Sequence, residues 1–219
     1  MKAKYNMTQK ENIFLAKRNI VDYIWKSANL EGIGVTYPDT QAIYNGMSVE
    51  GYSIDDINAV NDLKNAWHFL LEHINDKLNL EFVRSVHRLL GKFTIINAGC
   101  VRCEEVRMGG TDWIPEIPDE NKVKKEIFEI MNRKMSSLDK ALDLMLYLMR
   151  AQLFLDGNKR IAMLIGNKVM IENGQGIISV CQKDIKEFYT LLVAYYETND
   201  ATNIKHFLYN NCIDGMNLG

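Results

Sequence analysis

Apolar residues recur three and four positions apart along most of this 219-residue chain, which is the spacing of one face of an α-helix. A clear stretch follows Ser136, a residue type that often precedes a helix, and Asp139 stands three positions after it. The spacing predicts helices over residues 8–29, 54–75, 79–90, 119–134, 137–154, 158–173, 182–197 and 200–211. The fold class that we expect is therefore all-α.

One segment interrupts this helical spacing, and its sequence is GCVRCEEVRMGGTDWIPEIP, residues 99–118. Apolar and polar residues alternate in two short runs, and Gly109-Gly110 and two prolines accompany them. The pattern predicts a short β-hairpin, or flap, that is placed to cover a site.

Composition narrows the class of protein. With 47% hydrophobic residues, three prolines and no repeat, the chain is expected to form a single domain over residues 1–219. The net charge of −2 offers no basic surface for nucleic acid. Arg150 interrupts the most apolar run and the polar N-terminus lacks the apolar core of a signal peptide, so we expect a cytoplasmic protein without a membrane partner. The hydrophobic content also leaves room for a modest interface in a homo-oligomer.

Candidate chemistry lies in the stretch AQLFLDGNKR, where an apolar helix meets a polar turn at the start of the next helix. The amides of Gly157 and Asn158, followed by the cations Lys159 and Arg160, are expected to form a nest of N–H donors that suits phosphate. Asp156 supplies a carboxylate that can hold Mg²⁺ against the same phosphates. The alternative is an ordinary turn between helices, with Lys159 and Arg160 on a solvated face.

Gln152 stands on the apolar stripe of its helix, one turn after Leu148 and Met149. A buried polar group at this position must find a partner. Two interpretations stay open: a core glutamine bonded to a nearby carbonyl, or a residue that faces the bound phosphates.

Residues 152–163, QLFLDGNKRIAM, resemble the central motif of the Fic/Doc family, H-x-F-x-[D/E]-G-N-[G/K]-R-x-x-R, but differ at its first and last positions. Residues 80–90 look like the family's helix with an LxxIHxxL-like pattern, which here contains His87. Residues 101–115 look like the family's flap. The resemblance implies a Fic-fold helical core over about residues 54–212, with a short β-hairpin flap.

The resemblance also implies an activity, because members of the family mostly transfer AMP from ATP to a hydroxyl of a target protein, whereas Doc phosphorylates its target. The expected cofactors are ATP and Mg²⁺. The roles carried over to this sequence are a loop anchor at Phe154, a Mg²⁺ ligand at Asp156, a phosphate cradle at Gly157, Asn158 and Lys159, and charge neutralisation at Arg160.

The flap is expected to align the target by strand addition, so the implied partner is an unidentified target protein that docks there. The docking residues carried over from the family are Val101, Arg102 and Trp113.

A second motif lies in about residues 1–50, which we expect to form an N-terminal helix and a connection. Ser27, Glu31 and Gly32 match the family's inhibitory pattern [S/T]-x-x-x-E-[G/N]. In such proteins the glutamate meets the last arginine of the central motif and blocks seating of the γ-phosphate. A plain helix C-terminus with Gly32 as its cap is compatible with the same residues.

Two departures weaken the catalytic prediction. Gln152 replaces the family's catalytic histidine, and an amide cannot supply the general-base contribution of about 10²–10⁴ in rate. Met163 replaces the last arginine, the presumed partner of Glu31, so we hypothesise that Glu31 pairs with Arg160 instead.

The prediction is therefore a Fic-fold protein that resembles adenylyltransferases and retains ATP and Mg²⁺ binding, with impaired chemistry. Whether it is an enzyme stays open, because the catalytic histidine is missing. The alternatives are a non-catalytic protein-binding module that uses the flap, and a weakly active nucleotidyl- or phosphotransferase.

Overall fold

The computed structural model describes residues 1–216, which form ten α-helices, one 3₁₀ turn and two short strands. The helices are α1 (Gln9–Arg18), α2 (Ile20–Leu30), α3 (Tyr37–Tyr44), α4 (Ile54–Glu72), α5 (Leu80–Leu90), α6 (Glu120–Asn132), α7 (Ser137–Ala151), α8 (Asn158–Glu172), α9 (Ile185–Thr198) and α10 (Thr202–Asn211). The 3₁₀ turn η1 (Gln182–Asp184) precedes α9, and the strands are β1 (Ile177–Ile178) and β2 (Ile213–Asp214). The all-α class expected from the periodicity is confirmed.

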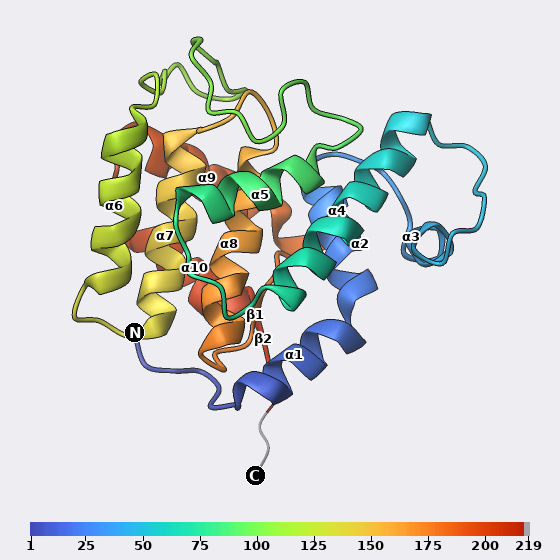
Figure 1. Cartoon of the computed structure of the whole chain (residues 1–219), viewed down its shortest axis with the longest axis horizontal. Helices are drawn as coiled ribbons and strands as arrows, with labels where there is room; N and C mark the ends of the chain where they lie inside the picture. Colours follow the sequence, from blue (N-terminus) through green and yellow to red (C-terminus); the bar gives the residue numbers. More distant parts are fainter. Residues whose placement is uncertain (217–219) are drawn as a thin grey trace.

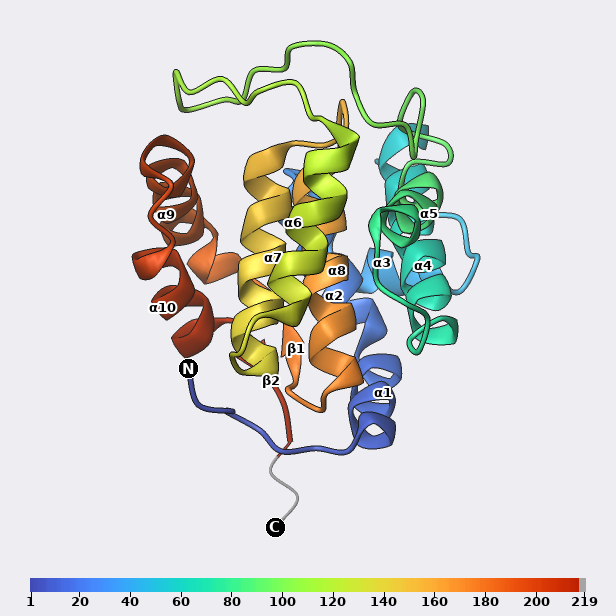
Figure 2. The same cartoon turned by 60° about the vertical axis from the view of Figure 1, so that its left-hand side comes forward.

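Helices α7 and α8 form the centre of the molecule (Figures 1 and 2). Helix α8 is buried along almost its whole length, and it also contacts α1, α4 and α5. Helix α6 covers α7, while α9 and α10 lie on one side of this central layer and α4 and α5 on the other (Figure 2). The predicted phosphate loop, which joins α7 to α8, therefore lies at one end of the central pair, beneath the flap segment.

The N-terminal region differs from the prediction in two ways. The single helix expected over residues 8–29 is divided at Asn19, whose backbone leaves the helical region and whose N–H still bonds to Leu15. The break lets α1 pack on α8 while α2 packs on α3 and α4. The expected connection also contains α3, which Thr36 caps at its N-terminus; eight residues are too few for a distinct helical period.

The predicted β-hairpin over residues 99–118 is wrong in its hydrogen bonding. The segment is extended and doubles back at the turn formed by Gly109 and Gly110, but it contains no strand (Figure 2). The ladder found in the described residues instead pairs Ile177 with Asp214 and Ile178 with Ile213. Pro115 and Pro118 have no N–H to donate, which weakens any ladder in the flap.

The apolar core is continuous. One cluster of buried apolar side chains extends in sequence from Met7 to Ile213 and includes residues of the N-terminal helices and of the later ones. Among residues 1–216, no helix combines the length and the apolar character that a membrane crossing requires.

Candidate functional site

The loop between α7 and α8 is held in shape from within. Phe154 donates its main-chain N–H to Oδ1 of Asn158 at 2.9 Å, and Nδ2 of Asn158 donates to the Phe154 carbonyl at 2.7 Å. The Phe154 ring is buried and stacks on His87 at 3.7 Å between ring centres. The side chain of Asn158 therefore closes the loop, which leaves only its main-chain N–H for the predicted phosphate cradle.

His87 ties this loop to the start of the flap segment. Its Nδ1 accepts a hydrogen bond from the Gly99 N–H at 2.8 Å, so Nε2 carries the proton and donates to the Asp156 carbonyl at 3.0 Å. Burial lowers the pKa of His87 to about 4, which keeps the ring neutral at physiological pH. The sequence placed His87 in the motif-bearing helix but did not predict this bridge, since both partners are distant in sequence.

Gly157 is required by conformation and by space. Its φ of +76° lies in the left-handed region, and it precedes the first residue of α8. A Cβ at this position would lie 2.9 Å from Cδ1 of Ile95 and 3.2 Å from Nε2 of His87. Only glycine fits here without moving the surrounding side chains.

The two cations at the start of α8 are both ion-paired. Lys159 Nζ lies 3.3 Å from Glu31 Oε2, and Arg160 Nη2 lies 3.0 Å from Asp156 Oδ2. The hypothesis that Glu31 pairs with Arg160 is therefore wrong: Glu31, at the end of α2, reaches Lys159. Burial by itself lowers the pKa of Lys159, but the charge and hydrogen bond of Glu31 together with the charge of Tyr189 outweigh burial, and the pKa is raised.

Two polar atoms of this cluster lack partners in the described part of the chain. Oε1 of Glu31 and Nε of Arg160 are both buried without a hydrogen bond. The Arg160 side chain is 7% exposed, whereas that of Asp156 is 64% exposed. Arg160 therefore retains a buried donor beside the loop, while Asp156 presents its carboxylate to solvent.

The donor set suits a magnesium ion only if a ligand completes it. Within residues 1–216, no three histidine, cysteine, aspartate or glutamate side chains converge as a metal site. Mg²⁺ needs no such group, because it is usually held by one or two carboxylates together with phosphate oxygens and water. The exposed carboxylate of Asp156 fits that requirement.

A cavity of about 230 Å³, which we call the motif cavity, opens above this cluster. Its walls come from the loop, from the end of α2, from α9 and from the first limb of the flap, which is the part that precedes the Gly109–Gly110 turn. The lining residues are Glu31, Val106, Arg107, Met108, Gly109, Gln152, Leu155, Asp156, Asn158, Lys159, Tyr189, Leu192, Val193 and Tyr196.

Gln152 combines features of both interpretations that the sequence left open. It has the left-handed backbone conformation that ends α7, and its Nε2 donates to the Met149 carbonyl at 2.6 Å, as expected of a core glutamine. It is also one of the residues that line the motif cavity. A carboxamide does not take up a proton near neutral pH, so Gln152 cannot act as a general base in either interpretation.

The residues of the inhibitory-type motif are divided between two places. Glu31 lines the motif cavity, whereas Ser27 lines a separate small cleft with Met163, the residue at the position of the missing arginine. Gly32 follows α2 with a φ of +81° and donates to the Asn29 carbonyl, so the interpretation as a helix C-terminus is confirmed, while the inhibitory role stays a prediction.

Of the three predicted docking residues, Arg102 is placed inside the protein. It is 4% exposed and donates to the carbonyls of Gln152 (2.6 Å), Glu104 (2.5 Å), Glu116 (2.6 Å) and Pro115 (3.4 Å). The prediction that Arg102 docks a target does not fit this burial. Its guanidinium instead holds both limbs of the flap to the end of α7, in place of a strand ladder.

The other two docking residues lie nearer the surface. Val101 is half-buried and packs against the apolar core. Trp113 is also half-buried; it stacks on Tyr196 at 5.7 Å between ring centres and covers the guanidinium of Arg150 at 4.4 Å. Because Tyr196 lines the motif cavity, Trp113 supports one of its walls from the outer side.

Comparison with known proteins gives one family. The model of the Fic/DOC family matches residues 77–170, which include α5, the flap, α7 and the loop described above. The chain is 27% identical to the protein adenylyltransferase fic-1 of Caenorhabditis elegans. This alignment covers 78% of the chain but 35% of the relative, so the chain spans about a third of that protein's length.

Two solved structures show the same fold. Fic-1 of C. elegans, residues 134–508, superposes with a TM-score of 0.74 at 22% identity, over 89% of this chain and 60% of that one. The Bartonella tribocorum effector protein BepC, solved with bound AMPPNP, superposes with a TM-score of 0.55 at 15% identity, over 83% of this chain and 90% of that one.

Proposed function

Since residues 77–170 match the model of the Fic/DOC family, we propose that the motif cavity of this chain binds the phosphates of ATP together with Mg²⁺, in a relative of the protein adenylyltransferases whose own transfer step is impaired. The observation that carries the proposal is the constellation at the start of α8. There Asp156, Asn158 and Lys159 line the cavity, and Asp156 presents an exposed carboxylate. Gly157 and Arg160 belong to the same stretch of chain beside them. The nucleotide analogue bound to BepC supports the assignment of ATP.

Each residue has a definite task in this proposal. The amides at the start of α8 and the Lys159 ammonium bind phosphate oxygens, and the buried Nε of Arg160 adds a donor beside them. Asp156 holds the metal, which when bound neutralises phosphate charge. Phe154 and His87 keep the loop in the required shape.

The transfer step lacks its base. A target hydroxyl must lose a proton when it attacks phosphorus, and Gln152 stands at the position where the family has histidine. Positioning by the remaining residues still favours transfer, so the highest activity that we expect is a slow residual transfer to a target protein.

Glu31 restrains nucleotide binding in this proposal. Its carboxylate pairs with Lys159 at the cavity wall, so an incoming phosphate has to take Lys159 from Glu31 and must tolerate a nearby negative charge. The family's inhibitory glutamate is thus expected to act here through lysine, because Met163 provides no cation.

A second candidate function is a non-catalytic protein-binding module. The observation in its favour is that Lys159 and Arg160 both form ion pairs with carboxylates of the chain itself. In that case the motif cavity is a folded remnant, and the flap side of the molecule carries the function.

Calorimetric titration with ATP and Mg²⁺ separates the two. We expect binding that requires Mg²⁺ and weakens at least about tenfold in Asp156→Asn, whereas Asp55→Asn, at an exposed aspartate of α4, leaves it unchanged. Absence of binding at millimolar ATP, in the native chain and in Glu31→Gln alike, refutes nucleotide binding and favours the binding module.

Gln152→His, alone and with Met163→Arg, then tests the origin of the impairment. We expect the rate of AMP transfer to protein to increase about 10²–10⁴-fold in the presence of Mg²⁺. Mass spectrometry of the added AMP measures this rate. Equal modification by the native chain would instead support an active transferase with another base.

A further inference from the structure

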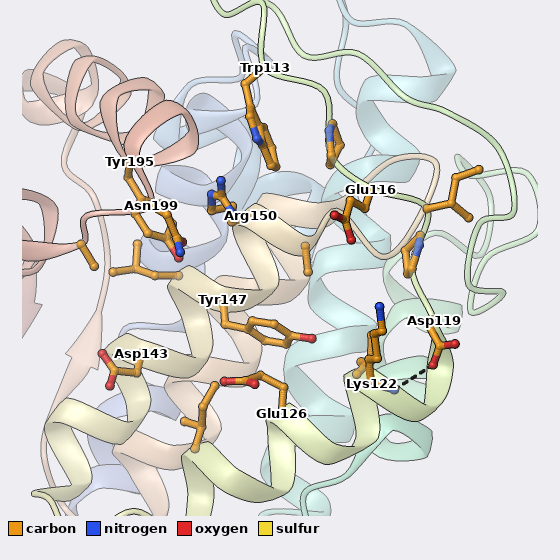
Figure 3. A pocket seen from close by; sticks show the side chains of 18 of the residues that line it. Trp113, Glu116, Asp119, Lys122, Glu126, Asp143, Tyr147, Arg150, Tyr195 and Asn199 are labelled. Atoms are coloured by element: carbon orange, nitrogen blue, oxygen red, sulfur yellow. Dashed lines mark hydrogen bonds between the residues drawn. The ribbon is translucent and has the colours of Figure 1, made fainter.

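A second and larger cavity lies outside the motif cavity, and we call it the lateral cavity (Figure 3). It measures about 690 Å³ and lies between the second limb of the flap, residues 113–119, and helices α6 and α7, with α9 at one end. No described residue lines both cavities. The stacked pair Trp113 and Tyr196 separates them, since Trp113 lines the lateral cavity and Tyr196 the motif cavity.

Arg150 has donors to spare in this cavity. Its Nε donates to the Tyr196 carbonyl at 3.1 Å, and its guanidinium carbon lies over the Trp113 ring, 4.4 Å from the ring centre. No carboxylate of residues 1–216 lies within 4.0 Å of it, although Arg150 is only half-buried. The outer edge of the guanidinium is therefore free to bind a carboxylate through two parallel hydrogen bonds.

Three of the other six charged residues that line the cavity form ion pairs. Glu126 and Asp143 pair with Arg133 at 2.9 Å and 3.6 Å, and Asp143 also pairs with Lys205 at 2.7 Å. Figure 3 shows Glu126 and Asp143 in the lower part of the cavity, away from Arg150. The acidic residues there are consequently a weak obstacle to an anionic group near Arg150.

The other end of the cavity carries unpaired charges of both signs. The side chains of Lys122 and Glu116 extend toward one another across the opening in Figure 3, and neither forms an ion pair within the described residues. Asp119, beside them, caps α6 by accepting from the Lys122 N–H at 2.8 Å. This end of the cavity can therefore bind the polar main chain of another polypeptide as well as a charged side chain.

The shape and the roof favour a polypeptide. The roof is an extended segment without a strand partner, and Ile114 and Ile117 on it are 41% and 55% exposed. Trp113, Tyr147 and Tyr195 add aromatic side chains, the type enriched at protein interfaces. An extended chain can pair with such a segment and place its side chains in the trough below.

We propose that the lateral cavity binds an extended acidic segment of a protein partner, with one partner carboxylate seated on the Arg150 guanidinium beneath Trp113. The proposal that a segment binds here depends only on the cavity. The further statement that this partner is the target of the transferase rests on the proposed function. Because the cavity wall is shared through Trp113 and Tyr196, a segment held here passes directly beside the motif cavity.

The probe is a phage library of random twelve-residue segments, selected on the native chain without nucleotide. We expect the retained segments to be enriched in aspartate or glutamate. A synthetic peptide of the strongest clone is then compared with its Glu→Gln or Asp→Asn counterpart by fluorescence anisotropy. Loss of the peptide carboxylate should weaken binding about tenfold or more.

The protein side is tested with Arg150→Gln and Arg150→Lys. We expect Arg150→Gln to weaken the acidic peptide as much as the peptide substitution does, with no further loss when both are combined. Arg150→Lys should be intermediate because lysine keeps the charge and loses the planar fork. Lys125→Gln, on the exposed surface of α6, serves as the matched control and should bind like the native chain.

Several results would overturn the inference. One is a selection in which the retained segments are not enriched in aspartate or glutamate. Another is a peptide whose affinity is unchanged both by loss of its own carboxylate and by substitution of Arg150. The peptide substitution does not depend on whether the protein variants fold. ATP titration of Arg150→Gln keeps the two proposals apart, since we expect this variant to bind nucleotide normally. Peptide binding by a native chain that does not bind nucleotide would refute the proposed function alone. Nucleotide binding by a native chain that does not bind the acidic peptide would refute this inference alone.

Discussion

Replacement of Arg102 by methionine tests whether one buried side chain holds the flap. Methionine keeps an unbranched apolar stem of similar reach and removes every hydrogen-bond donor. The guanidinium of Arg102 donates to main-chain oxygens of Gln152, of Glu104 and of the 115–116 segment, so one substitution removes these side-chain hydrogen bonds to both limbs of the flap. The main-chain bond from the Arg102 N–H to the Leu153 carbonyl remains.

The size of the destabilisation depends on whether each carbonyl oxygen that loses its Arg102 donor can bond to water instead. A hydrogen bond from a charged donor contributes about 1.5–3 kcal/mol, but water replaces the donor wherever the acceptor can be solvated. The carbonyls of Glu104 and Glu116 belong to exposed residues, whereas Pro115 and Gln152 are buried, and an unsatisfied buried acceptor costs about 1–3 kcal/mol. Burial also lowers the pKa of Arg102, so removing the charge returns part of the loss. We expect a net destabilisation of about 2 kcal/mol.

Two assays report the effect. Urea unfolding measures the global loss, and limited trypsin digestion at the exposed Arg107 measures local release of the flap. Arg18→Met, at an exposed arginine of α1, is the control and should change neither. An unfolding free energy lowered by less than about 0.5 kcal/mol, together with an unchanged digestion rate, would refute the view that Arg102 substitutes for a strand ladder.

Three further predictions concern the motif loop. Glu31→Gln frees Lys159 and should strengthen ATP binding about tenfold in calorimetry; unchanged affinity would remove Glu31 from the proposed function. Gly157→Ala should lower the free energy of unfolding by about 2 kcal/mol in urea, because alanine is strained at a φ of +76° and its Cβ meets Ile95; a native-like midpoint would contradict this. The pKa of His87 is about 4 when folded and 6.5 as its ordinary value, so the unfolded chain binds the proton first and stability should fall by about 3 kcal/mol as pH drops from 6.5 to 4. His87→Gln should flatten that slope in urea titrations, and an equally steep slope in this variant would assign the effect to other groups.

The helices of the second half of the chain were predictable because each satisfies a local rule. Ser136 caps α7, an apolar stripe follows it, and a Gly-containing loop separates α7 from α8. The family motif was equally legible, since its residues are contiguous. Where local rules were weak the prediction failed: Asn19 divides a continuous apolar pattern, and the alternating pattern of the flap did not produce a ladder.

The sequence by itself thus determined the class of fold, the place of the loop that we predict to bind phosphate, and the presence of glutamine instead of histidine at position 152. Only the tertiary structure decided which groups meet there. Glu31 faces Lys159 across more than a hundred residues of sequence, and His87 joins Gly99 to Asp156. The physical reason is that helix periodicity and capping act within a few residues, whereas ion pairs and buried hydrogen bonds depend on how whole helices pack.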